Sequence, residues 1–266
     1  MKRLLKVFLV LAIVAGLAVP AMAGDTVEKI IQRGEIRVAV QTQGPPFSFI
    51  DKHGKRTGSS VELCRLIAKE MGVKVKFLDY DWDGLIPALL SKKADMLAAD
   101  MTATLKRALK VSFTEPFYMS KSVVFTKKEN AGKFKTLADC NKPGIRTAVL
   151  LGSTGETDAR RLLSKTQIKP YKGGGPLLIN AVLSGKADIG VNDLSAIRGQ
   201  MQNFPKGSIA ILPISLSAQP LSFAVRPEDT HLLQWLNLFF MWIKNDGRLQ
   251  QNLDYWVNSN RWRKDH

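Results

Sequence analysis

The sequence predicts an α/β protein in which two doubly wound lobes are joined by a two-segment hinge. A fourteen-residue pattern occurs twice, at 88–101 and 181–194, and each copy suggests a helix end, a polar turn and a short apolar strand followed by a carboxylate. The strand and helix succession then restarts, and an alternating segment, 209–224, leads back toward the first lobe. Ligands lie outside the carboxyl ends of strands in open α/β sheets, so Asp100 and Asp193 predict a ligand held between two lobes. Chance similarity within α/β sequence is the alternative explanation of the repeat.

Residues 24–120 are predicted to form the first part of lobe 1. Apolar residues alternate or run continuously in the strands, and they recur on one face in the helices. The succession is β-α-β-α-β, as at the start of a doubly wound sheet. In chain order we expect a strand at 35–40, a hairpin around 47–55, a helix at 61–71, a strand at 73–77, a helix at 83–91 and a strand at 96–99.

Residues 121–216 are predicted to form lobe 2, and 217–266 to return to lobe 1. The segments 122–127 and 209–224 are expected to cross between the lobes, which implies a hinge that closes around a ligand. The aromatic-rich tail at 231–256 has helical spacing and is interpreted as core packing. The remaining lobe 2 elements are a strand at 146–150, helices at 156–163 and 177–183, and a strand at 189–191.

The first 23 residues have the pattern of a secretory signal peptide. A positive start is followed by an apolar run at 7–19 and an Ala-Met-Ala cleavage pattern that ends at Ala23. The alternative is an N-terminal membrane anchor, although the run is shorter than the ~20 residues that span a bilayer. We therefore expect an exported protein of the periplasm.

The net charge of +16 is spread along the chain, and three of the cations lie in the leader. No long basic run is interleaved with aromatic residues, so we do not expect nucleic-acid binding, although a basic surface suits an anionic bilayer or partner. The few His and Cys residues lack zinc-ligand spacing, and we expect neither a metal nor a cofactor. Cys64 and Cys140 are interpreted as two buried free thiols; a disulfide that ties the lobes together is the alternative.

Several blocks, in the same order, resemble the family 3 periplasmic solute-binding proteins, the polar amino-acid-binding partners of ABC transporters. The resemblance covers essentially the whole mature chain and implies the type II periplasmic-binding-protein fold. The matching blocks are 82–89, 94–104 with Arg107, 113–118, 152–155, and 185–188 leading to Asp193.

The resemblance implies a site for a free amino acid. Arg107 lies at the family's carboxylate-binding arginine, and Thr102 lies at its hydroxyl donor. Ser153 and Thr154 are expected to add backbone N–H groups at the start of a helix, where anions bind. Asp193 lies at the position that holds the ligand ammonium. A planar guanidinium suits a carboxylate, and an anion suits an ammonium.

Three further residues are candidates for the same site. Trp82 lies where relatives place an apolar or aromatic wall, and Phe47 follows the proline loop; core packing is the alternative for each. Asp100 stands where the family more often has Ser or Gly. It either favours a cationic or amide-bearing ligand, or it caps a backbone turn. Gln41 and Gly44 replace residues typical of basic-amino-acid binders, so the specificity of the best-known relatives does not carry over.

The resemblance implies a monomeric carrier that performs no covalent chemistry and delivers an amino acid to an inner-membrane ABC permease. One alternative is cyclohexadienyl dehydratase, an enzyme on the same fold that this chain resembles at 142–145 and in its tail. That enzyme has a Glu where this chain has Ala196, so a general acid is missing there. A ligand-binding sensor component is the second alternative.

Overall fold

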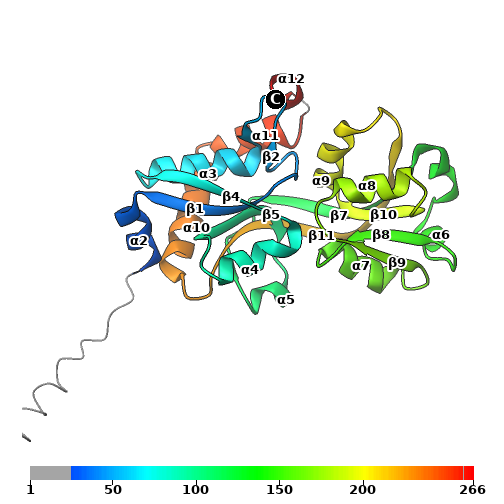
Figure 1. The fold of residues 1–266 in the computed structure, drawn as a ribbon, viewed down its shortest axis with the longest axis horizontal. Helices are drawn as coiled ribbons and strands as arrows, with labels where there is room; N and C mark the ends of the chain where they lie inside the picture. Colours follow the sequence, from blue (N-terminus) through cyan, green and yellow to red (C-terminus); the bar gives the residue numbers. More distant parts are fainter. Residues whose placement is uncertain (1–24, 260) are drawn as a thin grey trace, which may run out of the picture.

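The computed structural model describes residues 25–259 and 261–266, so the predicted signal peptide lies outside the described residues. In that part of the chain one nine-stranded sheet runs through two lobes that lie side by side (Figure 1). The strand order is β4-β1-β5-β11-β7-β10-β8-β9, and β6 also pairs with β11. The strands are β1 (Glu35–Gln41), β2 (Phe49–Ile50), β3 (Arg56–Thr57), β4 (Lys74–Tyr80), β5 (Met96–Thr102), β6 (Ser112–Phe113), β7 (Tyr118–Lys127), β8 (Arg146–Leu150), β9 (Gln167–Tyr171), β10 (Ile189–Asp193) and β11 (Ile209–Val225). The predicted α/β class is confirmed.

Helices cover both faces of the sheet in each lobe. In lobe 1, Val38 and Val40 of β1 pack toward α3 and α10, whereas Ala39 packs toward α4 on the other face. Lobe 2 has the same arrangement, with α8 on one face and α7 on the other. The helices are α2 (Thr26–Arg33), α3 (Ser59–Glu70), η1 (Trp82–Gly84), α4 (Leu85–Leu90), α5 (Leu105–Ala108), η2 (Lys128–Lys133), α6 (Leu137–Cys140), α7 (Thr154–Leu162), α8 (Pro176–Leu183), α9 (Leu194–Gln200), η3 (Met201–Asn203), α10 (Thr230–Asn245), α11 (Arg248–Trp256) and α12 (Trp262–Asp265).

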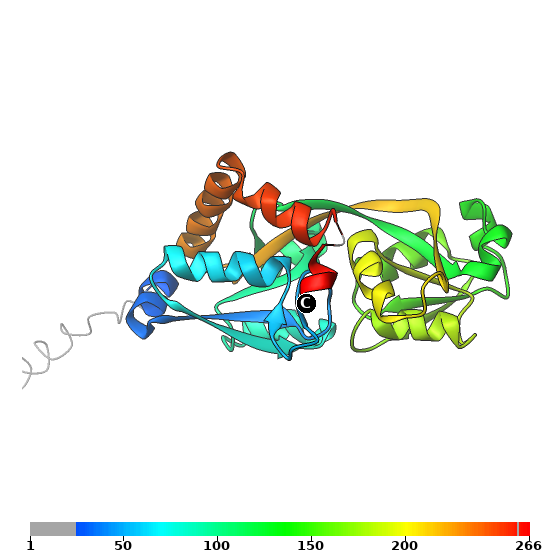
Figure 2. The ribbon, with the colours of Figure 1, turned by 90° about the horizontal axis from the view of Figure 1, so that it is seen from above.

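Two long antiparallel strands, β7 and β11, run from one lobe into the other (Figure 2). Their pairing extends from Tyr118 opposite Leu221 to Lys127 opposite Ile209, with register shifts on either side of Ser215. In lobe 1 β11 pairs with β5, and in lobe 2 β7 pairs with β10. These strands are the crossing segments that the sequence predicts; β7 begins four residues earlier than expected, and β11 ends one residue later.

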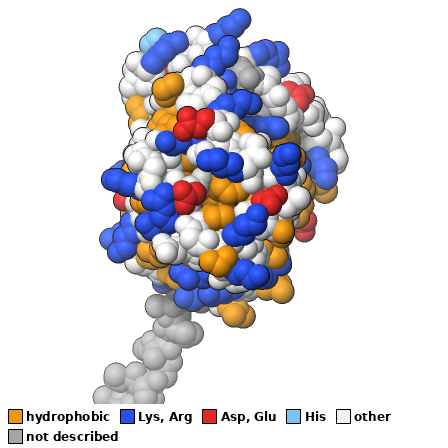
Figure 3. Space-filling model, turned by 90° about the vertical axis from the view of Figure 1, so that its right-hand side faces the viewer, with side chains coloured by type: hydrophobic (Ala, Val, Ile, Leu, Met, Phe, Trp, Pro, Cys, Tyr) orange, Lys and Arg blue, Asp and Glu red, His pale blue; other side chains and the backbone are white. Residues whose placement is uncertain are grey.

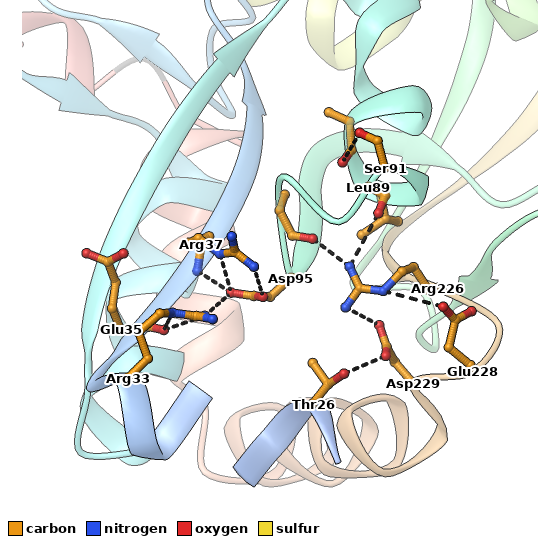
Figure 4. Close-up of polar contacts among 12 residues, drawn as sticks. Thr26, Arg33, Glu35, Arg37, Leu89, Ser91, Asp95, Arg226, Glu228 and Asp229 are labelled. Atoms are coloured by element: carbon orange, nitrogen blue, oxygen red, sulfur yellow. Dashed lines mark hydrogen bonds and ion pairs between the residues drawn. The ribbon is translucent and has the colours of Figure 1, made fainter. Parts of the chain in front are cut away.

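The repeated pattern has one structural acid in each lobe. The Asp95 carboxylate accepts hydrogen bonds from the backbone N–H of Arg37 at 2.8 Å and from its Nη2 at 2.9 Å (Figure 4). In lobe 2 the Asp188 carboxylate accepts from the backbone N–H of Arg146 at 2.8 Å and from its Nη2 at 2.7 Å. Each acid therefore fastens the turn before one strand to the neighbouring parallel strand.

The return segment is fastened to lobe 1 by a buried cation, Arg226. Its guanidinium donates to the backbone carbonyls of Ala94 at 2.6 Å and Leu89 at 3.3 Å, and Nη2 lies 2.8 Å from Asp229 Oδ2 (Figure 4). The other oxygen of Asp229 accepts from the Thr26 hydroxyl at 2.7 Å. This network connects the first described helix, the end of β11 and the turn before β5.

Three local predictions are corrected by the structure. Strand β5 continues to Thr102, so Asp100 lies inside the strand and not beyond it, because the sheet continues through pairing with β11. The predicted helical tail is two helices, since Gly247 takes a left-handed φ of 85° between them. Helices α2 and α9 and strand β9 were not predicted.

Basic side chains are dispersed on the outer face of lobe 2 (Figure 3), and the two cysteines are free thiols. On the outer end of lobe 2, Lys and Arg side chains are scattered among apolar and a few acidic ones (Figure 3). Cys64, in α3 of lobe 1, and Cys140, at the end of α6 in lobe 2, are both free and buried. No helix within residues 25–259 and 261–266 is both long and apolar enough to cross a membrane.

Candidate functional site

A small cavity lies between the lobes, at the carboxyl ends of four strands. Gln41 ends β1, Thr102 ends β5, Leu150 ends β8 and Asp193 ends β10, so parallel strands of both lobes deliver side chains to one place. The lining residues are Gln41, Trp82, Asp100 and Thr102 from lobe 1, and Leu150, Ser153, Thr154, Gly155, Gly175, Asn192, Asp193, Ala196 and Gln200 from lobe 2.

Asp193 is the last residue of β10 and the N-cap of α9. Its Oδ1 accepts hydrogen bonds from the backbone N–H groups of Ser195 at 2.8 Å and Ala196 at 3.1 Å. Its Oδ2 is buried and has no hydrogen-bond partner among the described residues. Burial raises the pKa of Asp193 to about 6, against the opposing effect of its hydrogen bonds. One oxygen of this acid is thus held by the helix while the other is left for a ligand.

Asp100 has a backbone conformation that is rare for a residue with a side chain. Its φ is 47°, in the left-handed region that Asp and Asn tolerate better than other such residues. Asp100 is only 7% exposed, and its Oδ1 has no partner among the described residues. Burial, and then the nearby charge of Asp193, raise the pKa of Asp100 well above its ordinary value, while Arg107 acts against that shift.

Arg107 lies at the edge of the cavity and not in its wall. Its Nη1 donates to the Thr102 carbonyl at 2.8 Å, and its Nη2 donates to the Gly152 carbonyl of lobe 2 at 3.1 Å. The guanidinium carbon is 5.4 Å from the centre of a Trp82 ring. Burial lowers the pKa of Arg107 to about 10, so the group stays positive at neutral pH. Since a guanidinium has five N–H donors, others remain for a carboxylate.

The hydroxyl groups of Thr102 and Thr154 meet on a residue of the crossing strand. Gln219 Oε1 accepts from Thr102 Oγ1 at 2.6 Å and from Thr154 Oγ1 at 2.7 Å. Thr102 belongs to lobe 1 and Thr154 to lobe 2, so buried Gln219 connects the two lobes at the cavity. The sequence does not indicate Gln219, because a lone amide in a long alternating strand carries no signal of its position.

The start of α7 lines the cavity, but the backbone N–H of Ser153 donates to the Leu150 carbonyl at 3.0 Å, so the donor expected at Ser153 is already used. Ser153 is the N-cap, and its hydroxyl accepts from the Glu156 backbone N–H at 3.1 Å, so the hydroxyl serves the helix. A Cβ on Gly155 would lie 3.0 Å from the Val191 carbonyl, so the absence of a side chain lets the helix start pack closely against β10. Free N–H groups at a helix start attract an anion.

The two predicted aromatic residues have different positions. Trp82 lines the cavity, and its backbone N–H donates to the Gly173 carbonyl of lobe 2 at 3.3 Å. Phe47 is not brought into the cavity. It is fully buried in the lobe 1 core, with its ring 6.2 Å from that of Phe117, because its carbonyl accepts from the Ser60 backbone N–H at the start of α3 and its side chain turns inward.

Amide side chains complete the wall. Gln41 lines the lobe 1 side, and Asn192 Nδ2 donates to Gln200 Oε1 at 3.1 Å on the lobe 2 side. Gln41 and Asn192 follow apolar strand residues, which is the same sequence signal that indicates Asp100. Gln200 lies on helix α9, which the sequence does not predict, and no such signal marks it. In the described part of the chain, no group of three or more His, Cys, Asp and Glu residues is placed to hold a metal ion.

The fold and the cavity together define a two-lobed binding protein for a small polar molecule. The chain belongs to the bacterial extracellular solute-binding proteins, family 3, whose model matches residues 36–259. It is 29% identical over 250 residues to the L-cystine-binding protein TcyJ of Escherichia coli (strain K12), which covers 93% of this chain and 92% of that protein.

An enzyme and its ancestral precursor are also similar to this chain. The cyclohexadienyl dehydratase of Pseudomonas aeruginosa is 24% identical over 269 aligned positions, covering 100% of this chain and 97% of the enzyme. Among solved structures, an ancestral amino acid-binding protein described as a precursor of cyclohexadienyl dehydratase has a TM-score of 0.82 and 35% identity, covering 88% of this chain and 100% of its own. The resemblance to the family and its two-lobed fold is thereby confirmed.

Proposed function

We propose that this protein is a monomeric periplasmic carrier that captures one amino acid between its lobes and delivers it to an inner-membrane ABC permease. The observation that carries the proposal is that a cation, Arg107, and a carboxylate, Asp193, lie at one cavity between the lobes, and that one Asp193 oxygen has no hydrogen-bond partner among the described residues. A free amino acid presents the complementary charges, an α-ammonium and an α-carboxylate, on adjacent atoms. Relatives named as amino-acid-binding proteins support this class of ligand.

The ligand carboxylate is expected to bind the free donors of Arg107 and the backbone N–H groups at the start of α7. A charged donor and a helix start both favour an anion there. The ligand ammonium is expected to bind Asp193 Oδ2, which supplies a negative acceptor. Trp82 closes one side of the cavity. Binding both lobes at once stabilises the closed state, which is the form that a permease distinguishes from the open one.

The first test removes the carboxylate partner. A screen of the twenty amino acids by thermal shift should identify ligands that raise the melting temperature, since a ligand that binds only the folded state stabilises it. Arg107→Ala should then weaken the best ligand by about 100-fold or more, as expected when one partner of a desolvated charge pair is lost. Lys106→Ala, a neighbouring exposed cation on α5, is the matched control and should leave the affinity unchanged. Equal affinity of Arg107→Ala and the native protein in calorimetry contradicts the carboxylate assignment.

The second test is the pH dependence of binding. The ammonium requires ionised Asp193, whose pKa is raised to about 6, so affinity should be constant above that pH. Below it, affinity should fall, approaching tenfold per pH unit, because ligand binding must displace the proton. In Asp193→Asn the affinity should be low and nearly independent of pH from 5 to 7. A native protein whose affinity is flat across that range contradicts the role of Asp193.

Delivery to a permease is tested in cells. Deletion of the gene should slow uptake of the amino acid that the purified protein binds, and restoring the native gene should recover uptake. Restoring Arg107→Ala should not recover it. Unchanged uptake after deletion, in a strain without a second carrier for that ligand, contradicts the transport role.

A dehydratase is the second candidate, favoured by full-length similarity to cyclohexadienyl dehydratase. Prephenate carries two carboxylates, and this cavity already contains two acids, Asp100 and Asp193, which do not suit a second ligand carboxylate. Ala196 lines the cavity where the enzyme has a Glu. Purified protein should therefore show no turnover of prephenate or arogenate by absorbance; catalytic turnover contradicts the carrier assignment.

A further inference from the structure

No hydrogen bond of the Asp100 side chain fastens the fold in the described part of the chain. The alternative role, capping a backbone turn, would give its carboxylate a backbone donor, yet its Oδ1 is buried without a partner among the described residues. The strand conformation at this position is the costly left-handed one, with φ of 47°. The acids of the repeated pattern that do fasten the fold, Asp95 and Asp188, are by contrast saturated with donors. The carboxyl group of Asp100 is thus left facing the cavity that it lines.

The charges around the cavity limit how Asp100 can take part. The ionisable groups are Asp100 and Asp193 in the wall and Arg107 at the edge; every other lining residue is uncharged. A zwitterionic ligand adds no net charge. With both acids ionised, the closed site would bury one uncompensated negative charge, which is strongly unfavourable. One proton on one acid brings the total to zero.

The hydrogen bonds decide which acid carries that proton. Asp193 accepts from two backbone N–H groups at the start of α9, where the helix dipole also favours a negative charge. Asp100 accepts from no described donor at Oδ1 and is more deeply enclosed. The proton therefore resides on Asp100, in agreement with the direction in which burial and Asp193 move its pKa.

The remaining wall shows what side chain the ligand carries. It consists of amides, Gln41, Asn192 and Gln200, together with the ring of Trp82. With the proton on Asp100 and with Asp193 bound to the α-ammonium, no residue of this wall supplies a counter-charge for a guanidinium or a second ammonium. Amides offer both donors and acceptors, which match a carboxamide or hydroxyl side chain.

We propose that Asp100 binds as a neutral carboxylic acid and makes the site selective for a zwitterionic amino acid with an uncharged polar side chain, against lysine and arginine. The proposal rests on the proposed function and names the ligand class of the same site. Asp100 acts here as a hydrogen-bond donor beside the ammonium acceptor Asp193, so it contributes specificity and leaves the ionic pairing to Asp193.

A pair of isosteric variants tests the proposal. Calorimetry at pH 7 should compare glutamine, asparagine and serine with lysine, arginine and ornithine for the native protein, Asp100→Asn and Asp193→Asn. Asparagine tolerates the left-handed backbone and has a donor in place of the acid proton. Asp100→Asn should keep the affinity for the best neutral ligand within about threefold, whereas Asp193→Asn should weaken it more than about 30-fold, as for loss of one partner in a buried charge pair.

Four results separate the possible outcomes. Tightest binding of a dibasic ligand by the native protein overturns the proposal, and so does a loss of more than about tenfold for a neutral ligand in Asp100→Asn at an unchanged melting temperature. If Asp100→Asn fails to fold, the test is the number of protons released when the native protein binds its ligand. Calorimetry at pH 7.5 in buffers of different ionisation enthalpy measures this number, which should be near zero. Release of about one proton means that Asp100 ionises, which overturns the proposal. If no amino acid binds the native protein, the proposed function itself has failed.

Discussion

At the scale of single residues, the repeated pattern contains two kinds of acid. Asp95 and Asp188 are held by the neighbouring arginine and by a backbone N–H group, and they fasten a turn to a strand. Asp100 and Asp193, five residues further on, each have a buried oxygen without a partner among the described residues. The second kind is indicated by the sequence because each acid follows a run of apolar residues, and both line the cavity. The first kind is not indicated, since the arginine partners lie far away in the sequence.

The two kinds of acid should respond oppositely to neutralisation. The pKa of Asp193 is about 6 in the folded protein, above its unfolded value near 3.8. Protonation of this acid therefore stabilises the fold fully below pH 3.8, and that stabilisation is lost as the pH rises through 6. Asp193→Asn cannot ionise and keeps the helix cap, so at pH 7 it should raise the free energy of unfolding of the unliganded protein by on the order of 1–3 kcal/mol. Urea unfolding at pH 7 and pH 4 checks this, and the gain should vanish at pH 4.

Asp188→Asn is the matched control for that experiment. Hydrogen bonds from Arg146 hold the pKa of Asp188 below its ordinary value, so this acid stabilises the fold above pH 4 and loses that effect as pH falls through its lowered pKa. The variant should be less stable than the native protein at pH 7. A gain of the same size in both variants contradicts the distinction between the two acids.

At the scale of elements, apolar strands and amphipathic helices can be predicted from the sequence, whereas short polar elements cannot. Strand β8 has the predicted bounds because it contains an apolar run at 148–151 that ends at the turn residue Gly152. Strand β9 is rich in polar residues and contains Pro170, and α9 spans only seven residues, so neither has the length or period that such analysis detects. The segments 36–40 and 145–149 share the pattern Ile-Arg-x-Ala-Val, which is a second sequence signal of the matching lobes.

Close packing of strand β10 against the crossing strand β7 gives a prediction for the element scale. A Cβ on Gly190 would lie 2.2 Å from the ring of Phe125, in a fully buried part of lobe 2. Gly190→Ala should therefore destabilise the protein by about 1–3 kcal/mol through overpacking, measured by denaturant unfolding. Gly132→Ala is the control, because a Cβ there meets nothing within 4 Å. Equal stability of the two variants contradicts the packing argument.

At the scale of the whole molecule, the two lobes are in direct contact. Trp82 donates to the Gly173 carbonyl, Arg107 donates to the Gly152 carbonyl, and the Pro45 carbonyl lies against Gly199 of α9. These contacts are possible only when the lobes are closed over the cavity. The sequence indicates a hinge but not this closed state, because contacts between lobes involve loop backbone and glycine, which have no periodic pattern.

The contact at Gly199 should decide how far the lobes close. A Cβ there would lie 2.4 Å from the Pro45 carbonyl across the interface, although alanine within a helix is otherwise favoured over glycine by roughly 0.5–1 kcal/mol. Gly199→Ala should therefore leave the unliganded protein at least as stable but weaken ligand binding by about tenfold. Small-angle X-ray scattering should show a smaller decrease in radius of gyration on ligand addition than in the native protein or in Gly132→Ala. A full decrease in Gly199→Ala contradicts the steric argument.

The distribution of the two cysteines has a practical consequence. Cys64 belongs to the lobe 1 core and Cys140 to the lobe 2 core, and burial raises the pKa of both thiols, that of Cys140 to about 11. Neither thiol is a reactive thiolate while its lobe is folded, and each becomes accessible to a reagent when that lobe unfolds. With no bridge between them, the molecule has one native chemical label per half. The alkylation rate of each cysteine therefore reports the unfolding of its own lobe, without any engineered probe.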